Sequence, residues 1–82
     1  MMDLDVYVAS AEKWFEIRCD EKCPVRIIVE SIWRQVKESE LAESDLEAGS
    51  FWLCCVDQER VLNPEHSLEE SGIRNGYRLM LI

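Results

Sequence analysis

The 82-residue sequence predicts an α+β fold in which a mixed five-stranded sheet packs against one main helix. Two alternating apolar segments near the N-terminus predict a hairpin, and the helical spacing of apolar residues directly after them predicts one long helix. Short apolar segments separated by turn residues in the second half predict three further strands. We therefore expect the order ββαββ, a short helical turn and a last strand, within a single domain that spans residues 1–82.

The first hairpin is predicted from the alternation of apolar and polar residues. Residues 3–9 alternate in this way, as is typical of a strand with one buried face. The apolar positions of this strand are Leu4, Val6 and Val8. Residues 10–13 are mostly small or polar and can turn the chain, and residues 14–19 alternate again. The side chains expected to face inward on this second strand are those of Phe15, Ile17 and Cys19.

The main helix is predicted to begin at Pro24, because proline fits the first position of a helix, where its missing N–H costs nothing. Apolar residues then recur at the three-and-four spacing of one helical face. This stripe consists of Val25, Ile28, Val29, Ile32 and Val36. Trp33 borders the stripe and is expected to cover its edge. The helix should end near Glu38 or Ser39.

An acidic stretch follows the helix. Residues 38–47 contain five carboxylates and no basic residue: Glu38, Glu40, Glu43, Asp45 and Glu47. We expect a solvated loop with one short turn near residues 41–46, ended by Gly49 and Ser50. A docking site for a basic partner is the alternative interpretation of this stretch.

Two strands are expected after the acidic stretch. Residues 51–56 are nearly all apolar and form the third strand. Residues 57–59 turn the chain, and residues 60–62 form a short fourth strand, which Asn63 and Pro64 end.

The last part of the sequence contains a turn and the final strand. Residues 67–70 have the pattern of a capped helical turn, which Gly72 ends. Asn75 and Gly76 predict a further turn because both residues tolerate a positive φ. Residues 77–82 then form the final strand. Its inward side chains are those of Leu79 and Leu81.

Composition and charge argue against several classes of protein. The net charge is −8 and the nine basic residues are scattered singly, whereas binding to phosphate backbones needs clustered Lys and Arg. No apolar run approaches the roughly 20 residues of a membrane helix. The acidic residues Asp3 and Asp5 stand where a signal peptide carries basic ones. We therefore expect a cytoplasmic protein with no direct membrane insertion and no nucleic-acid partner.

The cysteines and the single histidine do not form a recognisable site. Cys19 and Cys23 are spaced C-x3-C, Cys54 and Cys55 are adjacent, and neither spacing fits the usual zinc pattern. Adjacent strand residues also point to opposite faces. We expect reduced thiols and no metal or cofactor, with a disulfide or a metal site as less favoured alternatives. His66 has no obvious partner for nucleophilic catalysis, so no enzymatic activity is expected.

The end of the sequence resembles a known group of domains. In residues 68–81 a leucine opens a short turn, an isoleucine follows, and a polar turn leads into a Leu-x-Leu strand. This segment is similar to the closing segment of ubiquitin-like domains. The resemblance implies a ubiquitin-like β-grasp fold. It also implies core positions for Leu68, Ile73, Leu79 and Leu81.

A narrower resemblance covers nearly the whole sequence. Residues 24–33 resemble the P-V-x-x-x-(V/I)-x-x-x-W helix of the YukD/EsaB family, and residues 51–53, 60–62 and 71–76 are similar to that family as well. These are small bacterial ubiquitin-like proteins associated with the type VII secretion system, which exports WXG100 proteins. The resemblance implies a non-catalytic accessory or regulatory protein. Its implied partners are membrane-anchored components of the system or its ATPase.

The sequence ends on Leu81 and Ile82, whereas ubiquitin-type modifiers need a flexible tail that ends in Gly-Gly. We therefore expect that this protein is not conjugated to others. Two alternative functions remain open. One is a generic ubiquitin-like interaction or scaffold module of another pathway, and the other is a modifier precursor truncated before its Gly-Gly.

Strand alternation predicts a protein-binding patch. If Leu53 and Leu79 face inward, six other side chains of the same two strands face outward. These are Trp52, Cys54, Val56, Arg78, Met80 and Ile82. The two strands are neighbours in ubiquitin-like folds, and aromatic, Met and Arg side chains are enriched at interfaces. We expect a partner to dock here, while a covering loop or a homodimer interface are the alternatives.

Overall fold

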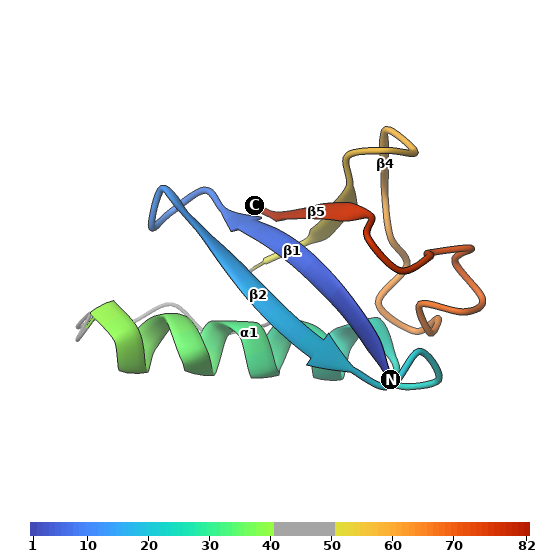
Figure 1. Cartoon of the computed structure of the whole chain (residues 1–82), viewed down its shortest axis with the longest axis horizontal. Coiled ribbons are helices and arrows are strands. Elements are labelled where there is room, and N and C mark those ends of the chain that lie inside the picture. Colours follow the sequence, from blue (N-terminus) through green and yellow to red (C-terminus); the bar gives the residue numbers. More distant parts are fainter. Residues whose placement is uncertain (41–50) are drawn as a thin grey trace.

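The computed structural model describes residues 1–40 and 51–82 (Figure 1). The helix and strands follow one another in the predicted order. They are β1 (Met2–Val8), β2 (Lys13–Cys19), α1 (Val25–Glu40), β3 (Leu53–Cys55), β4 (Arg60–Val61) and β5 (Arg78–Leu81). The predicted turn at residues 41–46 and most of the acidic stretch lie outside the described residues.

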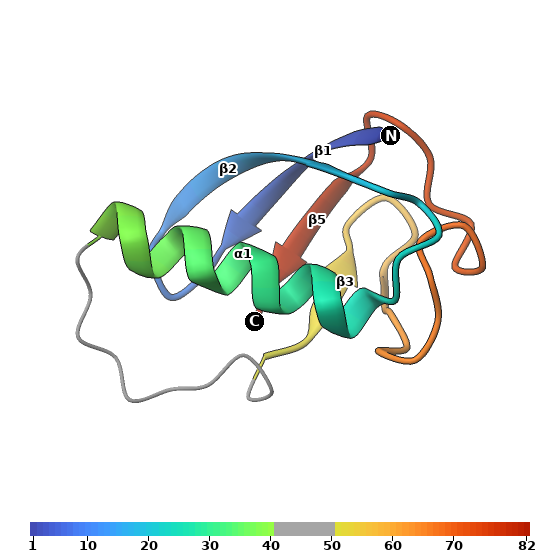
Figure 2. The same ribbon diagram turned by 90° about the horizontal axis from the view of Figure 1, so that it is seen from below.

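The strands form one mixed sheet in the order β2-β1-β5-β3-β4. β1 pairs antiparallel with β2 and parallel with β5, while β3 pairs antiparallel with β4 and with β5. The last strand therefore lies in the middle of the sheet. α1 lies across one face of the sheet, which Figure 2 shows from the helix side. The predicted architecture, a mixed five-stranded sheet on one main helix, is confirmed.

The sheet and α1 enclose the core. The buried strand residues are those that the alternation predicted: Leu4, Val6, Val8, Ile17, Leu53, Cys55, Leu79 and Leu81. The apolar stripe of α1 is also buried: Val25, Ile28, Val29, Ile32 and Val36. Leu68 and Ile73 join this cluster, as the resemblance implied. Phe15 and Cys19 are only partly buried, since they lie on β2 at the edge of the sheet.

The first turn of α1 is held by a segment from the second half of the chain. The N–H of Val25 donates to the carbonyl of His66 at 2.8 Å, and the N–H of Arg26 donates to the carbonyl of Pro64 at 3.0 Å. N–H groups in the first turn have no acceptor within their own helix, so these bonds satisfy donors that would otherwise need water. The helix continues to Glu40, slightly beyond its predicted end.

Trp33 is buried more deeply than predicted. Its side chain is only 5% exposed. Its ring lies 4.4 Å from the ring of Phe51, measured between centroids. An aromatic pair of this kind contributes about 0.5–1.5 kcal/mol beyond the burial of its area. Trp33 is therefore a core residue that ties α1 to the segment entering β3, rather than a cover for the edge of the stripe.

β3 is shorter than the strand predicted at residues 51–56, and β4 likewise ends one residue early. Backbone hydrogen bonds nevertheless continue beyond β3 on both sides. Trp52 and Ile82 exchange two N–H···O bonds of 2.9 and 3.0 Å. The N–H of Val56 donates to the carbonyl of Arg78 at 2.9 Å. The pairing of β3 with β5 therefore extends over almost the whole length predicted for the third strand.

The predicted helical turn before β5 is one capped turn and not a regular helix. The N–H of Glu70 donates to Oγ of Ser67 at 3.1 Å, and the N–H of Ser67 donates to Oε1 of Glu70 at 3.1 Å. This reciprocal pair is the capping box expected from the sequence. Gly72 has a φ of +73°. The N–H of Ile73 donates to the carbonyl of Leu68 at 3.0 Å, which closes the turn and directs Ile73 into the core.

Replacing a core residue of α1 should destabilise the fold much more than the same change on its exposed side. Ile32 is 1% exposed and Ile27 is 37% exposed in the same helix. We expect Ile32→Ala to lower the free energy of unfolding by about 2–5 kcal/mol, because it leaves a cavity. The matched control Ile27→Ala should cost less than about 1 kcal/mol. Urea unfolding of both variants measures this difference, and equal losses would contradict the described orientation of α1.

The capping box should make stability depend on pH. Hydrogen bonds from Ser67, the one from its backbone N–H first, lower the pKa of the exposed Glu70 carboxyl below its ordinary 4.5. A carboxyl with a lowered pKa in the folded state stabilises the fold above its unfolded pKa. That stabilisation disappears as the pH falls through the folded pKa. We therefore expect the unfolding free energy of Glu70→Gln to fall less than that of wild type below pH 4.5.

Urea unfolding at a series of acidic pH values measures this effect. The neighbouring exposed variant Glu69→Gln is the control and should keep the wild-type pH dependence. An unchanged pH dependence in Glu70→Gln would show that the capping box does not stabilise the carboxylate.

Candidate protein-binding surface

The six residues of the predicted patch lie together on the face of the sheet opposite α1, which we call the open face. They form three cross-strand pairs: Trp52 with Ile82, Cys54 with Met80, and Val56 with Arg78. Directly opposed residues in an antiparallel pair share one face, with Cβ atoms about 4.5–5.5 Å apart. The structure thus brings the six side chains together. That they bind a protein stays a prediction.

Apolar side chains of the patch are well exposed. Trp52 is 52% exposed, Ile82 50% and Val56 36%. Cys54 and Met80 are half-buried between them. A contiguous exposed apolar surface of this kind is typical of a binding site, whereas single exposed apolar residues need no explanation.

The apolar surface continues across all five strands, which the sequence does not predict. The pairing register places one apolar side chain from each strand in a line: Trp14, Tyr7, Met80, Cys54 and Val61. We call this line the apolar row. Trp14 is 55% and Val61 52% exposed. The rings of Tyr7 and Trp14 lie 5.2 Å apart between centroids. The outward position of Trp14 could have been predicted, because Trp14 lies on the same side of β2 as the polar residues Glu16 and Arg18.

Arg78 is the charged member of the patch, and Asp57 holds it in place. Its backbone N–H donates to Oδ2 of Asp57 at 2.7 Å. Its guanidinium Nη2 lies 3.7 Å from Oδ1 of the same carboxylate. The positive charge of Arg78 is thus partly compensated within the chain, at the end of the patch next to Val56.

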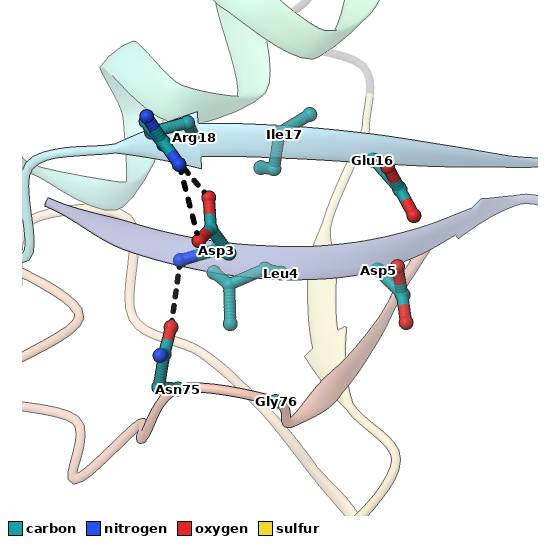
Figure 3. A pocket seen from close by; sticks show the side chains of 8 residues that line it. All are labelled: Asp3, Leu4, Asp5, Glu16, Ile17, Arg18, Asn75 and Gly76. Atoms are coloured by element: carbon teal, nitrogen blue, oxygen red, sulfur yellow. Dashed lines mark hydrogen bonds and ion pairs between the residues drawn. The ribbon is translucent and has the colours of Figure 1, made fainter.

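Charged residues occupy the open face beside the apolar row, around the start of β1 and the end of β2 (Figure 3). Nε of Arg18 donates to Oδ1 of Asp3 at 2.9 Å, and this bond holds the pKa of Asp3 below its ordinary value. Both side chains are exposed, so the pair adds little to stability. Oδ1 of Asn75 accepts the N–H of Asp3 at 2.7 Å. These contacts fasten the start of β1 to the turn before β5.

Two of the four thiols are less acidic than an ordinary cysteine. All four cysteines are free. Partial burial raises the pKa of Cys19 and Cys54, and a raised pKa makes a thiol less nucleophilic. Cys55 faces the core while Cys54 faces the open side, as the alternation predicted. His66 is exposed. The absence of enzymatic activity stays a prediction.

Two findings on the described ranges bear on other classes of site. Within residues 1–40 and 51–82, no three His, Cys, Asp or Glu side chains are grouped so that they could hold a metal ion. No helix in this part of the chain has the length and hydropathy needed to cross a membrane.

Three solved structures that share the fold are named as ubiquitin or ubiquitin-like domains. The ubiquitin-like domain of EccD5 from Mycobacterium xenopi is 26% identical, with a TM-score of 0.75 over 99% of this chain and 91% of that one. A ubiquitin from Caldiarchaeum subterraneum is 18% identical, with a TM-score of 0.70 over 99% and 90%. A ubiquitin-like domain from Arabidopsis thaliana is 16% identical, with a TM-score of 0.74 over 99% and 74%. The last two show the fold alone, and the expected ubiquitin-like β-grasp fold is confirmed.

The family comparison agrees with the narrower resemblance. No curated protein matches the sequence. The family model described as "WXG100 protein secretion system (Wss), protein YukD" matches residues 4–81. This match covers all the strands and the helix apart from the first two residues of β1. The chain therefore belongs to the YukD family of ubiquitin-like proteins associated with the WXG100, or type VII, protein secretion system.

Proposed function

We propose that this protein acts as an accessory or regulatory protein of its secretion system by binding another protein through the open face, in the cytoplasm and without catalysis. The observation that carries the proposal is the exposed apolar surface on the face of the sheet that α1 leaves uncovered. Its centre is the pair of Cys54 and Met80. Two exposed tryptophans lie near that centre: Trp52, two residues from Cys54 in the same chain segment, and Trp14, in the same row on β2.

The composition of the open face fits a protein interface. Tryptophan, tyrosine, methionine and arginine are the residue types most enriched in interface cores. All four occur here, as Trp52, Tyr7, Met80 and Arg78. The residues that dominate binding energy usually lie near the centre of such a patch, ringed by polar groups that exclude water. Asp57 and the Asp3–Arg18 pair supply polar groups of this kind.

The chemistry of the described residues supports binding more than catalysis. Cys54, the thiol on the open face, has a raised pKa, while a nucleophilic cysteine needs a lowered one. The buried polar side chains Ser67 and Ser71 are used within the turn before β5: Oγ of Ser67 accepts the N–H of Glu70, and Oγ of Ser71 donates to the carbonyl of Ser67. These groups stabilise the fold and leave no nucleophile–base pair among them.

The partner that we propose is a component of the secretion machinery, either a membrane-anchored component or its ATPase. Membership of the YukD family supports this class of partner, because the family is described as part of the WXG100 protein secretion system. A homodimer through the open face is the second candidate, since an exposed apolar sheet face is also suited to self-association. A generic interaction module of another pathway would use the same surface with other partners.

Negative charges introduced at Met80, in the centre of the patch, and at Val56, at its end, should abolish partner binding. Val56 is 36% exposed and Met80 is half-buried on the open face. We expect the Val56→Asp/Met80→Asp variant to weaken binding at least about 30-fold, because two carboxylates would be desolvated in an apolar interface. Ile27→Asp, at an exposed apolar position of α1, is the matched control and should bind like wild type.

The measurement is a pull-down from lysate of the source bacterium, read by mass spectrometry, with circular dichroism to show that each variant is folded. Capture of secretion components by wild type and Ile27→Asp, and their loss with the double variant, is the expected result. Capture that survives the double variant would contradict the open face as the site. A wild-type protein that captures no secretion component and remains monomeric in gel filtration would contradict the proposed function.

A further inference from the structure

One end of the apolar row carries two carboxylates that face each other. Asp5 on β1 and Glu16 on β2 are directly opposed in the sheet. Figure 3 shows their side chains extending in the same direction from neighbouring strands. Like charges directly opposite one another on a sheet destabilise the pairing. Within residues 1–40 and 51–82, no cationic side chain forms an ion pair with either carboxylate.

Two arginines on the neighbouring positions of the sheet are engaged by other acids. Arg18 is two residues from Glu16 on β2, but its guanidinium is bonded to Asp3 at 2.9 Å. Arg78 is in register with Asp5 across β1 and β5, but its guanidinium lies against Asp57. The negative charge of Asp5 and Glu16 is therefore not neutralised by a dedicated partner, on a chain whose net charge is already −8.

An exposed tryptophan completes this corner of the open face. Trp14 precedes Glu16 by two residues, so both side chains leave β2 on the same side. Trp14 is 55% exposed, and the ring of Tyr7 braces it at 5.2 Å. Asp5, Trp14, Glu16 and Arg78 together line a hollow of about 410 Å³. The face of a tryptophan ring attracts a cation, and two carboxylates beside it strengthen that attraction.

We infer that the open face binds a segment of a partner protein that lays apolar side chains along the apolar row and places one arginine or lysine beside Trp14, against Asp5 and Glu16. This inference rests on the proposed function, because it names the chemistry of the partner for the same surface. The charge complementarity at this corner is what selects a basic protein segment. Acidic or uncharged segments would leave the two carboxylates desolvated and unpaired.

The sheet geometry also sets the spacing within the partner. Neighbouring strands lie about 4.8 Å apart, and two strand intervals separate the carboxylate pair on β2 and β1 from the Met80–Cys54 pair on β5 and β3. The carboxylate pair also lies two residues further along the strands, which is about 7 Å, so the cation and the central apolar anchor of the partner should be about 12 Å apart. Two residues seven positions apart on one face of a helix are separated by about 10.5 Å, at about 1.5 Å per residue, and the length of the arginine side chain covers the remainder.

The test uses the full chain, labelled with ¹⁵N, and a designed helical peptide as the probe. The peptide is alanine-rich, about 18 residues long, and carries an arginine and a leucine seven positions apart. A second peptide replaces the arginine by citrulline, which has the same shape and no charge. Titrations followed by two-dimensional NMR report the dissociation constants and the residues that shift, including the indole N–H of Trp14.

The arginine peptide should shift the signals of Trp14, Asp5 and Glu16 and should bind about tenfold more tightly than the citrulline peptide. The Asp5→Asn/Glu16→Gln variant should remove this tenfold preference, and it should melt no lower than wild type because a like-charge contact is gone. The control Glu65→Gln/Glu69→Gln makes the same change in net charge elsewhere and should keep the preference.

Equal binding of the two peptides, an undiminished preference in Asp5→Asn/Glu16→Gln, or no saturable shift on the open face would each overturn the inference. The Val56→Asp/Met80→Asp variant separates this result from the proposed function. If that variant loses secretion components while the arginine preference is absent in wild type, the docking face stands and the cation site fails. If the preference survives in that variant, the cation site acts without the central patch and the spacing argument is wrong.

Discussion

The parallel pairing of β1 with β5 is the constraint on which the rest of this structure depends. It joins segments from the two ends of the chain in the middle of the sheet, with Val6 beside Leu79 and Val8 beside Leu81, and all four side chains are buried. A register shift of one residue would turn both leucines to the solvent and Met80 into the core. The turn at Asn75 and Gly76, directly before β5, opposes such a shift. The N–H of Asp3 donates to Oδ1 of Asn75, and the carbonyl of Asp3 accepts the N–H of Gly76, whose φ is +86°.

Side chains alternate along β5 and β3, and this alternation separates the residues that form the core from those that we expect to bind a partner. Leu79 and Leu81 contact the core, while Met80 and Ile82 between and after them face outward. A substitution on the open face therefore changes the solvent-facing surface without making a cavity. A substitution in the core does affect the open face, since losing Leu79 would also disturb the position of its neighbour Met80. A surface of this kind can be adapted to a partner at little cost to stability, provided that the central pairing is kept.

Local patterns in this sequence predict the elements of the fold well, and they predict contacts between distant elements poorly. The period of two in β1 and the period of three and four in α1 are visible within a few residues, and the buried residues follow from them. The depth of Trp33 could not be predicted, because it depends on Phe51 being brought against it. The apolar row could not be predicted for the same reason, because Tyr7 lies beside Met80 only through a pairing between residues 73 positions apart. Leu68 and Ile73 were placed in the core by a resemblance, since no simple period marks a single capped turn.

Charged and apolar side chains of the open face contribute differently to the binding of a partner. Apolar contacts are not directional, so five apolar side chains in a line do not by themselves define which way a partner segment crosses the sheet. Asp5 and Glu16 make the β2 end of that line chemically different from the β4 end, where Val61 lies. A cation in the partner would then fix its direction and speed its approach, while the apolar contacts determine how long it stays. Because exposed charges are screened over about 10 Å at 0.1 M salt, added salt should weaken the choice of direction before it weakens the apolar contact. The unfavourable opposition of two carboxylates in the free protein is thus consistent with a surface whose most stable state includes a bound partner.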